Sequence, residues 1–113
     1  MADNCLFCKI VRKEIAAKLV YEDDDCVAFR DIDPKAPTHV LIVPREHVGS
    51  LNEATDATLV GRLALIAARI AKQEGIAESG YRTVFNTNAD AGQTVFHLHL
   101  HLLGGRAMAW PPG

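Results

Sequence analysis

Residues 95–103, near the carboxyl end of the chain, read VFHLHLHLL and place three histidines at strict two-residue spacing. Successive side chains of a β-strand point to opposite faces of its sheet, so every second residue lies on the same face. The pattern therefore predicts a strand that presents His97, His99 and His101 on one face. Phe96 and the leucines form an apolar set on the other face. Three of the chain's five histidines stand in this row, which indicates a functional site rather than three separately buried imidazoles.

The remaining elements follow from the same periodicity. Strand-forming residues bounded by turn formers occupy five segments: 19–22, 26–30, 39–43, 81–86 and 95–103. Apolar residues at helical spacing predict a short helix over 5–13 and a long helix over 55–74. Thr55 or Asp56 can cap the long helix, and Gly75 can end it. Short connections favour antiparallel pairing, so the expected class is α+β.

Composition narrows the classes of protein. The chain has 113 residues, 49% of them apolar, and a formal net charge of -2, without repeats or shifts in composition. We therefore expect a single globular domain over 1–113. The lack of a Lys/Arg block argues against nucleic acid as a partner. No apolar run reaches the roughly 20 residues of a membrane span, and the first residues lack a signal-peptide pattern. The expectation is a cytoplasmic protein that does not associate with membranes.

Two kinds of chemistry suit a row of imidazoles: binding of a metal ion, or a nucleophile with acid-base partners. The segment 88–94, NADAGQT, precedes the histidines and offers only one carboxylate, Asp90, as a further metal ligand. Its small residues can instead present backbone N–H groups to an anionic oxygen. These surroundings favour phosphate or phosphoramide chemistry on imidazole.

A second candidate site is the pair Cys5 and Cys8, whose two-residue gap allows two thiolates to bind one zinc ion. A redox pair would need a βαβ context that the sequence lacks, and two unused thiols on a short helix are the remaining alternative. Cys26 stands alone in an apolar segment, as a small buried residue does. Three thiols in a chain without an export signal indicate a reducing compartment.

The segment 97–103 resembles the signature of the histidine triad (HIT) family, in which three histidines alternate with apolar residues. The segments 104–106 (GGR) and 110–113 (WPPG) resemble the Hint branch of that family, the protein kinase C inhibitor-like nucleotide-binding proteins. The resemblance extends over nearly the whole chain. It implies a five-stranded antiparallel sheet with a long central helix and a short N-terminal helix. It also implies a symmetric homodimer.

The same resemblance implies an enzyme. Members of the branch bind purine nucleotides of the AMP or GMP type and hydrolyse adenosine phosphoramidates through a covalent nucleotidyl-histidine intermediate. The expected function is therefore that of a purine nucleoside phosphoramidase, a hydrolase of P–N bonds. One alternative is a dinucleotide polyphosphate hydrolase of the neighbouring branch, which the WPPG tail disfavours. The other is a nucleotide-binding regulatory module whose hydrolysis is incidental.

Residue roles follow from the match to the family. The nucleophile corresponds to His99, while His101 would bond to phosphate oxygens and His39 would support the row from a neighbouring strand. Thr94 stands where the family has a serine that helps to protonate the leaving amine, and Asp31 matches the carboxylate that binds the ribose hydroxyls. The remaining nucleotide-binding set comprises an apolar base pocket and two loops: Phe7, Ile10, Ile15, Phe29, Ile32, Leu41, Asn86, Gly92 and Gln93. Each apolar member, taken singly, also fits ordinary core packing.

Some family members share the cysteine pair and complete a tetrahedral zinc site with two histidines, which match His47 and His97. A closed set of two thiolates and two imidazoles implies a structural zinc ion, so that His97 anchors while His99 reacts. The chain departs from close relatives at Ala109, where they have a polar residue or His. That departure concerns substrate preference contributed by the tail.

Overall fold

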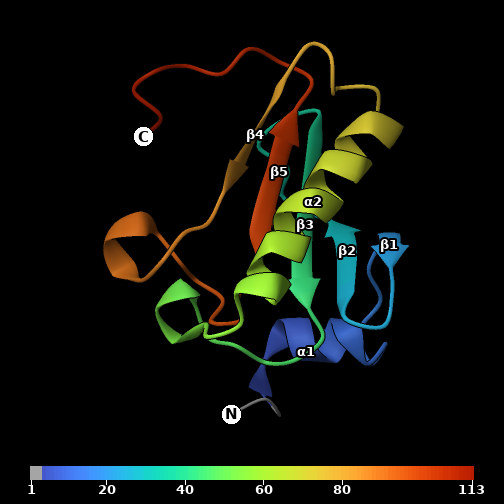
Figure 1. Ribbon diagram of the computed structural model, residues 1–113, viewed down its shortest axis with the longest axis vertical. Coiled ribbons are helices and arrows are strands. Elements are labelled where there is room, and N and C mark those ends of the chain that lie inside the picture. The colour runs from blue at the N-terminus through green and yellow to red at the C-terminus, as the bar shows by residue number, and fades with distance from the viewer. Residues whose placement is uncertain (1–3) are drawn as a thin grey trace.

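A computed structural model describes residues 4–113, and five of its strands form one antiparallel sheet in the order β1-β2-β3-β5-β4 (Figure 1). The strands are β1 (Leu19–Glu22), β2 (Cys26–Arg30), β3 (Thr38–Pro44), β4 (Tyr81–Val84) and β5 (Leu100–Gly104). The helices are α1 (Leu6–Val11) and α2 (Ala57–Gln73), with short 3-10 turns at Leu51–Glu53 and Ala89–Ala91. The expected α+β class, with a five-stranded antiparallel sheet, a long helix and a short one, is confirmed.

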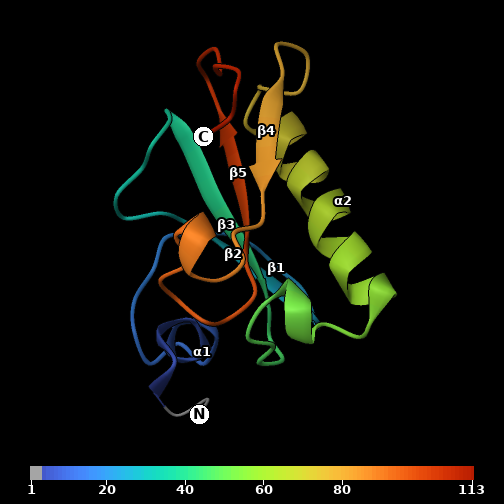
Figure 2. The same ribbon diagram turned by 90° about the vertical axis from the view of Figure 1, so that its left-hand side faces the viewer.

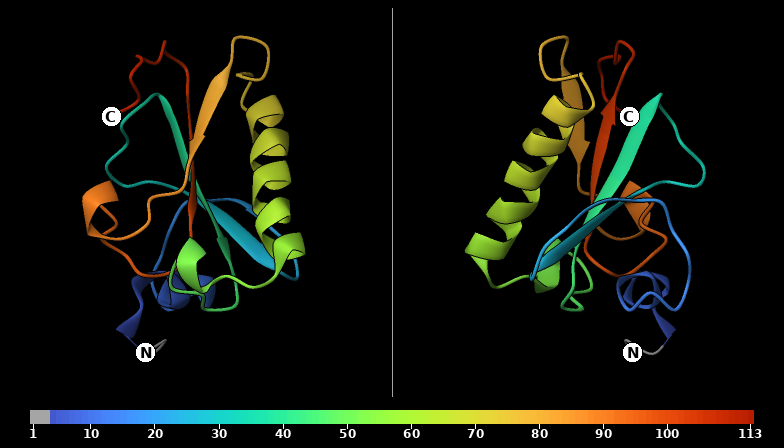
Figure 3. Two further views of the ribbon diagram at one scale, coloured as in Figure 1. Left: turned by 60° about the vertical axis from the view of Figure 1, so that its left-hand side comes forward. Right: turned by 90° about the vertical axis from the view of Figure 1, so that its right-hand side faces the viewer.

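Alternation along β2 and β3 divides the apolar residues between two cores. Ala28 and Ile42 point to the face on which α2 packs, whereas Phe29 and Leu41 point to the opposite face. Figure 2 shows α2 along the first face and α1 at one end of the second. The two views of Figure 3 place the segment that contains Ala89–Ala91 on the same side as α1. The second face therefore carries the short helix and the loops that surround the histidines.

Two contacts fix α2 close to the predicted range 55–74. The Asp56 side chain accepts hydrogen bonds from two backbone N–H groups of the first turn and caps the helix. Gly75 follows the last turn with a φ of 76°, a conformation that glycine adopts without strain. The Arg30 guanidinium donates two hydrogen bonds to the Glu74 carboxylate, at 2.9 and 3.0 Å. These bonds fasten the end of α2 to the end of β2.

The strand predicted over 95–103 is shorter than expected, because β5 begins only at Leu100. Its ladder with β3 stops where Pro44 has no N–H to donate. Leu98 instead donates its N–H to the carbonyl of Val48 at 2.6 Å, outside the sheet. The first two histidines of the row therefore lie in irregular chain that leads into the strand.

The predicted separation of the two faces still holds from Leu98 onward. Leu98, Leu100 and Leu102 are buried in the core beneath α2, whereas the imidazoles lie on the side of α1. Phe96, which was expected on the face of the leucines, does not join their core: it is 52% exposed, and the strand has not yet begun at that position.

Other differences are limited to the ends of elements. The predicted helix over 5–13 ends at Val11, and Lys13 then turns the chain with a φ of 63°. The predicted strand over 81–86 ends at Val84, while the strand predicted over 39–43 extends to Thr38–Pro44. Between residues 4 and 113, no helix combines the length and the apolar character needed to cross a membrane.

Candidate active site

A cavity of about 410 Å³ opens between α1, the segment that follows it, and the strands β2, β3 and β5. Its lining contains ten of the residues assigned by resemblance: Phe7, Ile10, Ile15, Phe29, Asp31, Ile32, Leu41, Thr94, His99 and His101. Ile32 is 97% exposed, so core packing does not account for its place at the rim. The structure thus brings together apolar side chains, one carboxylate, one hydroxyl and two imidazoles from five separate segments of the chain.

A smaller cavity of about 320 Å³ adjoins the first and shares Asp31 and His101 with it. His39 and Asn86 line this second cavity and not the first. The expected site residues are therefore divided between two adjoining spaces, with Asp31 and His101 at their boundary.

The protonation of the His99 ring follows from a hydrogen bond to the backbone. Its Nδ1 lies 2.7 Å from the carbonyl oxygen of His97, and a carbonyl oxygen can only accept, so Nδ1 carries the hydrogen. Burial lowers the pKa of His99, which favours the neutral ring. Nε2 then holds the lone pair. A neutral imidazole with a free Nε2 lone pair is a nucleophile.

A second chain of bonds sets the hydrogens on His39 and His101. The backbone N–H of Lys35 donates to Nδ1 of His39 at 3.0 Å, so the hydrogen of neutral His39 is on Nε2. That Nε2 lies 2.9 Å from Nδ1 of His101 and donates to it. Burial lowers the pKa of His39, and lowers the pKa of His101 to about 4. Neutral His101 therefore carries its own hydrogen on Nε2.

The three rings form a continuous group beside the apolar cavity. The ring centroids of His99 and His101 are 5.0 Å apart, and Phe7 places its ring edge-to-face against His99, also at 5.0 Å. One imidazole thus offers a lone pair and its neighbour an N–H. A phosphoryl group needs this combination, because phosphorus accepts the electron pair while its oxygens accept hydrogen bonds.

The loop before the histidines is held by Gln93, which is 7% exposed. Its amide nitrogen donates to the carbonyls of Gly49 and Val95, and its amide oxygen accepts from the N–H of Asn88. The N–H groups of Gly92 and Gln93 donate to carbonyls within the loop. Thr94 lines the large cavity, whereas Gly92 and Gln93 do not. The side chain of Gln93 therefore holds the loop in place next to Thr94.

A separate cluster contains Cys5, Cys8, His47 and His97, whose potential ligand atoms all lie within 4.8 Å of one another. Nδ1 of His97 is 3.3 Å from the Cys5 sulfur and 3.4 Å from the Cys8 sulfur, and Nδ1 of His47 is 3.3 Å from the Cys8 sulfur. Tetrahedral zinc would hold sulfur and nitrogen ligands about 3.5 Å apart. These four residues could therefore hold a metal ion.

The hydrogen bonding of His97 fits this use. Its Nε2 lies 2.8 Å from the carbonyl of Pro44 and must donate, which leaves Nδ1 with a lone pair directed at the two sulfurs. Burial lowers the pKa of His97 to about 4, so the ring is neutral. Burial and the neighbouring Cys5 raise the pKa of the Cys8 thiol to about 11. A bound cation would stabilise the deprotonated form of Cys8, because its positive charge offsets that of the thiolate.

Residues 12–108 match the HIT domain family. The chain belongs to the HIT domain family. It is 51% identical over 110 residues to a purine nucleoside phosphoramidase of Escherichia coli K12, and the match covers 96% of this chain and 92% of the relative. The prediction of a HIT protein is therefore confirmed.

Solved HIT structures agree with the fold. A HIT family hydrolase from Legionella pneumophila Philadelphia 1 superposes with a TM-score of 0.95 at 53% identity, covering 97% of this chain and 100% of that one. A zinc-bound histidine triad protein from Mycobacterium smegmatis has a TM-score of 0.84 at 32% identity, covering 94% and 78% of the respective chains.

Several contacts in the HIT site had no signal in the sequence. The backbone groups that set the ring hydrogens belong to His97, Pro44 and Lys35, and a backbone group leaves no trace in residue identity. Gln93 was assigned to the nucleotide through resemblance, and nothing in the sequence indicated that its side chain also holds the loop. The resemblance correctly indicated that His47 lies next to His97, 50 residues along the chain.

Proposed function

We propose that this HIT protein hydrolyses the P–N bond of purine nucleoside 5′-phosphoramidates, with His99 as the nucleophile. The observation that supports this most directly is the hydrogen bond from Nδ1 of His99 to the carbonyl of His97. It leaves the Nε2 lone pair free beside a cavity that also contains an N–H donor, His101, and a hydroxyl, Thr94. The name of the Escherichia coli relative supports the same activity.

In the first step of the proposed reaction, Nε2 of His99 attacks phosphorus and the P–N bond to the leaving amine breaks. The amine leaves with a proton, for which the Thr94 hydroxyl is the assigned donor. The positive charge that develops on the His99 ring is stabilised by the carbonyl of His97 through Nδ1–H. His101 donates its Nε2–H to a phosphoryl oxygen, which stabilises the charge that develops there.

In the second step, water attacks phosphorus and passes a proton to the Thr94 oxygen, which restores the hydroxyl. The bond to Nε2 of His99 breaks, which releases the nucleoside monophosphate and restores the neutral ring. The apolar residues of the cavity, among them Phe7, Phe29 and Leu41, would hold the purine base. Asp31 would accept hydrogen bonds from the ribose hydroxyls. Asn86 lines the adjoining cavity and would contact the phosphate side of the nucleotide.

We further propose that Cys5, Cys8, His47 and His97 hold a structural zinc ion. Two thiolates and two imidazoles complete a tetrahedral zinc site without an open position. Zinc would provide a cross-link between the amino-terminal segment and the chain that leads into β5. The zinc-bound Mycobacterium smegmatis relative supports the choice of metal.

The covalent step can be tested by intact-mass measurement after the protein is mixed with adenosine 5′-phosphoramidate and quenched at alkaline pH. The expected result is a mass increase of one nucleoside monophosphate, located on His99 by fragmentation. The His99→Asn variant should form no adduct and lose turnover by several orders of magnitude, while it still binds AMP. Turnover by His99→Asn at the rate of the unmodified protein would refute the proposed function.

A further inference from the structure

The group Asp31, His39 and His101 brings a carboxylate and two imidazoles within 4.8 Å of one another at the boundary of the two cavities. Two histidines and one carboxylate are also a common set of metal ligands. A histidine that ligates a metal normally donates the hydrogen of its other ring nitrogen. Nδ1 of His39 instead accepts from the N–H of Lys35, so Nε2 must carry a hydrogen. The hydrogen on Nε2 of His39 therefore occupies the position that a metal ion would need in this group.

The arrangement of His97 is the opposite. Its second nitrogen donates to the carbonyl of Pro44, which leaves the first free for a metal. Residues 4–113 thus contain two clusters of potential ligands. One backbone hydrogen bond in each favours metal binding at His97 and a ring hydrogen at Nε2 of His39.

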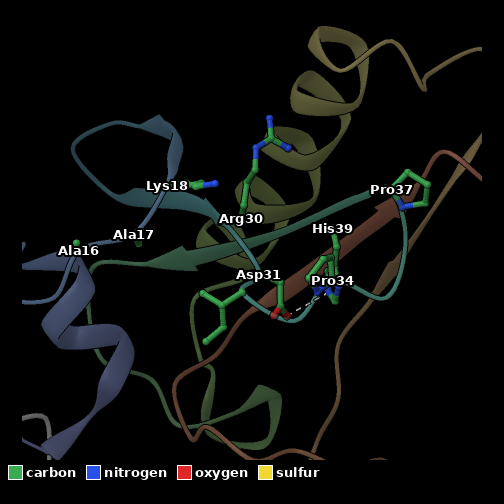
Figure 4. A pocket seen from close by; sticks show the side chains of 9 residues that line it. Ala16, Ala17, Lys18, Arg30, Asp31, Pro34, Pro37 and His39 are labelled. Atoms are coloured by element: carbon green, nitrogen blue, oxygen red, sulfur yellow. Dashed lines mark ion pairs between the residues drawn. The ribbon is translucent and has the colours of Figure 1, made fainter.

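Neutral His39 has only one ring hydrogen, and two acceptors lie within reach of it. Nδ1 of His101 is 2.9 Å from Nε2 of His39, and Oδ2 of Asp31 is 3.4 Å from the same atom. The close view in Figure 4 marks this contact between Asp31 and His39 with a dashed line. The nearer acceptor is His101, and the negative charge of Asp31 competes with it for the same hydrogen. The other carboxylate oxygen, Oδ1, is held by the N–H of Asp33 at 2.8 Å, so Oδ2 is the oxygen that remains for a new donor.

We infer that ribose binding at Asp31 strengthens, through His39, the hydrogen bond that holds the His101 ring in position for the reaction. A ribose hydroxyl that donates to Oδ2 of Asp31 satisfies the carboxylate, so the Nε2–H of His39 is shared less with Asp31 and bonds more strongly to Nδ1 of His101. His101 then carries its own hydrogen on Nε2 and directs it at the phosphoryl oxygen. Without the hydroxyl, Asp31 competes for the hydrogen of His39, so the bond from His39 to Nδ1 of His101 is weaker and the His101 ring is held less firmly.

This inference rests on the proposed function and adds a second task to Asp31. A residue that only binds the ribose contributes to affinity alone. A residue that also positions the hydrogens of the imidazole chain links the sugar of the substrate to the rate of the chemical step. Asp31 and His39 are therefore positioning residues for the reaction at His99.

The test compares adenosine 5′-phosphoramidate with its 2′,3′-dideoxy analogue and measures two quantities: the substrate Kd and the rate constant of adduct formation at saturation. In the unmodified protein, removal of the hydroxyls should weaken binding and also slow adduct formation about tenfold, the effect of a modest loss in acid-base assistance. In Asp31→Asn the competing charge is absent, so the dideoxy substrate should form the adduct several times faster than it does with the unmodified protein. A residue that only binds would not produce this gain.

Two further variants make the result specific. In His39→Gln the link is broken, so both substrates should form the adduct at equal rates, although more slowly than in the unmodified protein. Asp33→Asn is the matched control, because it removes the same charge from the same loop at a side chain that is 83% exposed. It should preserve the tenfold difference.

Equal adduct rates for the two substrates in the unmodified protein would overturn the inference, as would an unchanged ratio in both Asp31→Asn and His39→Gln. Failure of the proposed function gives a different result, because then no adduct forms with either substrate. Thermal melting of each variant separates loss of coupling from loss of folding.

Discussion

Replacement of Gln93 by leucine tests how the active-site loop is held. The side chain makes three hydrogen bonds, with Asn88, Gly49 and Val95, at 2.9 to 3.1 Å. Leucine has a similar size but can form none of them. The bond to Gly49 is fully buried, while the other two are partly buried, so water can reach those groups in part.

An unpaired buried polar group costs about 1 to 3 kcal/mol. Gln93→Leu loses one fully buried hydrogen bond and two partly buried ones, and it gains about 1 kcal/mol from the additional buried apolar surface. The net destabilisation is about 2 to 3 kcal/mol. For a domain of this size the melting temperature should fall by roughly 10 °C. Because Thr94 follows Gln93 directly, release of the amine in the covalent step should also slow.

Circular dichroism melts and urea titrations would measure the change in stability. Gln73→Leu is the matched control, because Gln73 is exposed at the end of α2; its stability should change by no more than about 0.5 kcal/mol. Gln93→Glu provides a second comparison. The buried carboxylate would face two carbonyl oxygens, which raises its pKa in the folded state, so this variant should gain stability as the pH falls. A stability of Gln93→Leu within 1 kcal/mol of the unmodified protein would refute the assigned role of these bonds.

Three further predictions concern other parts of the molecule. Cys8→Ser should lose zinc by elemental analysis and melt at a lower temperature, whereas Cys26→Ser should retain the metal; equal zinc contents would contradict the assigned site. Because the pKa of His101 falls to about 4 on folding, the unfolded chain binds more protons below pH 6.5, so stability decreases as the pH falls from 6.5 to 4. At pH 5 the protonation of this one ring in the unfolded chain should lower the free energy of unfolding by about 2 kcal/mol. Urea titrations of His101→Asn should show a pH dependence that is smaller by this amount. Light scattering at micromolar concentration should give a dimer mass, because α2 exposes Leu65 to the extent of 73%; a monomer mass would contradict this.

For the histidine row, the sequence predicts which side chains share a face but not where the strand begins. Two-residue spacing correctly predicted which side chains share a face, because alternation depends only on the local backbone. It could not predict where the regular strand begins. That boundary depends on the partner strand, whose Pro44 ends the ladder, and on the N–H of Leu98, which bonds to Val48 instead.

The cavity could not be predicted from periodicity at all. Phe7, Phe29 and Leu41 come from three segments and, taken singly, have the pattern of core residues. Only a resemblance to known proteins suggested a shared pocket, and the structure places them in one. Ile32 is the exception that sequence reasoning could have singled out, since an apolar residue within a polar, proline-containing loop has no core to join.

His97 connects the cysteine cluster to the nucleophile, because its ring faces the cysteines and its carbonyl accepts a hydrogen bond from Nδ1 of His99. Because the carbonyl and the ring belong to one residue, we expect a change of charge on the His99 ring to alter the electron donation of the His97 ring toward Cys5 and Cys8. Replacement of the proposed zinc ion by cobalt(II) would make this connection measurable. The visible absorption of the cobalt depends on the donor strength of the His97 ring, and it would change when His99 becomes covalently modified. The protein would then carry a colour reporter of its own chemical step, at a distance from the substrate and without a label on it.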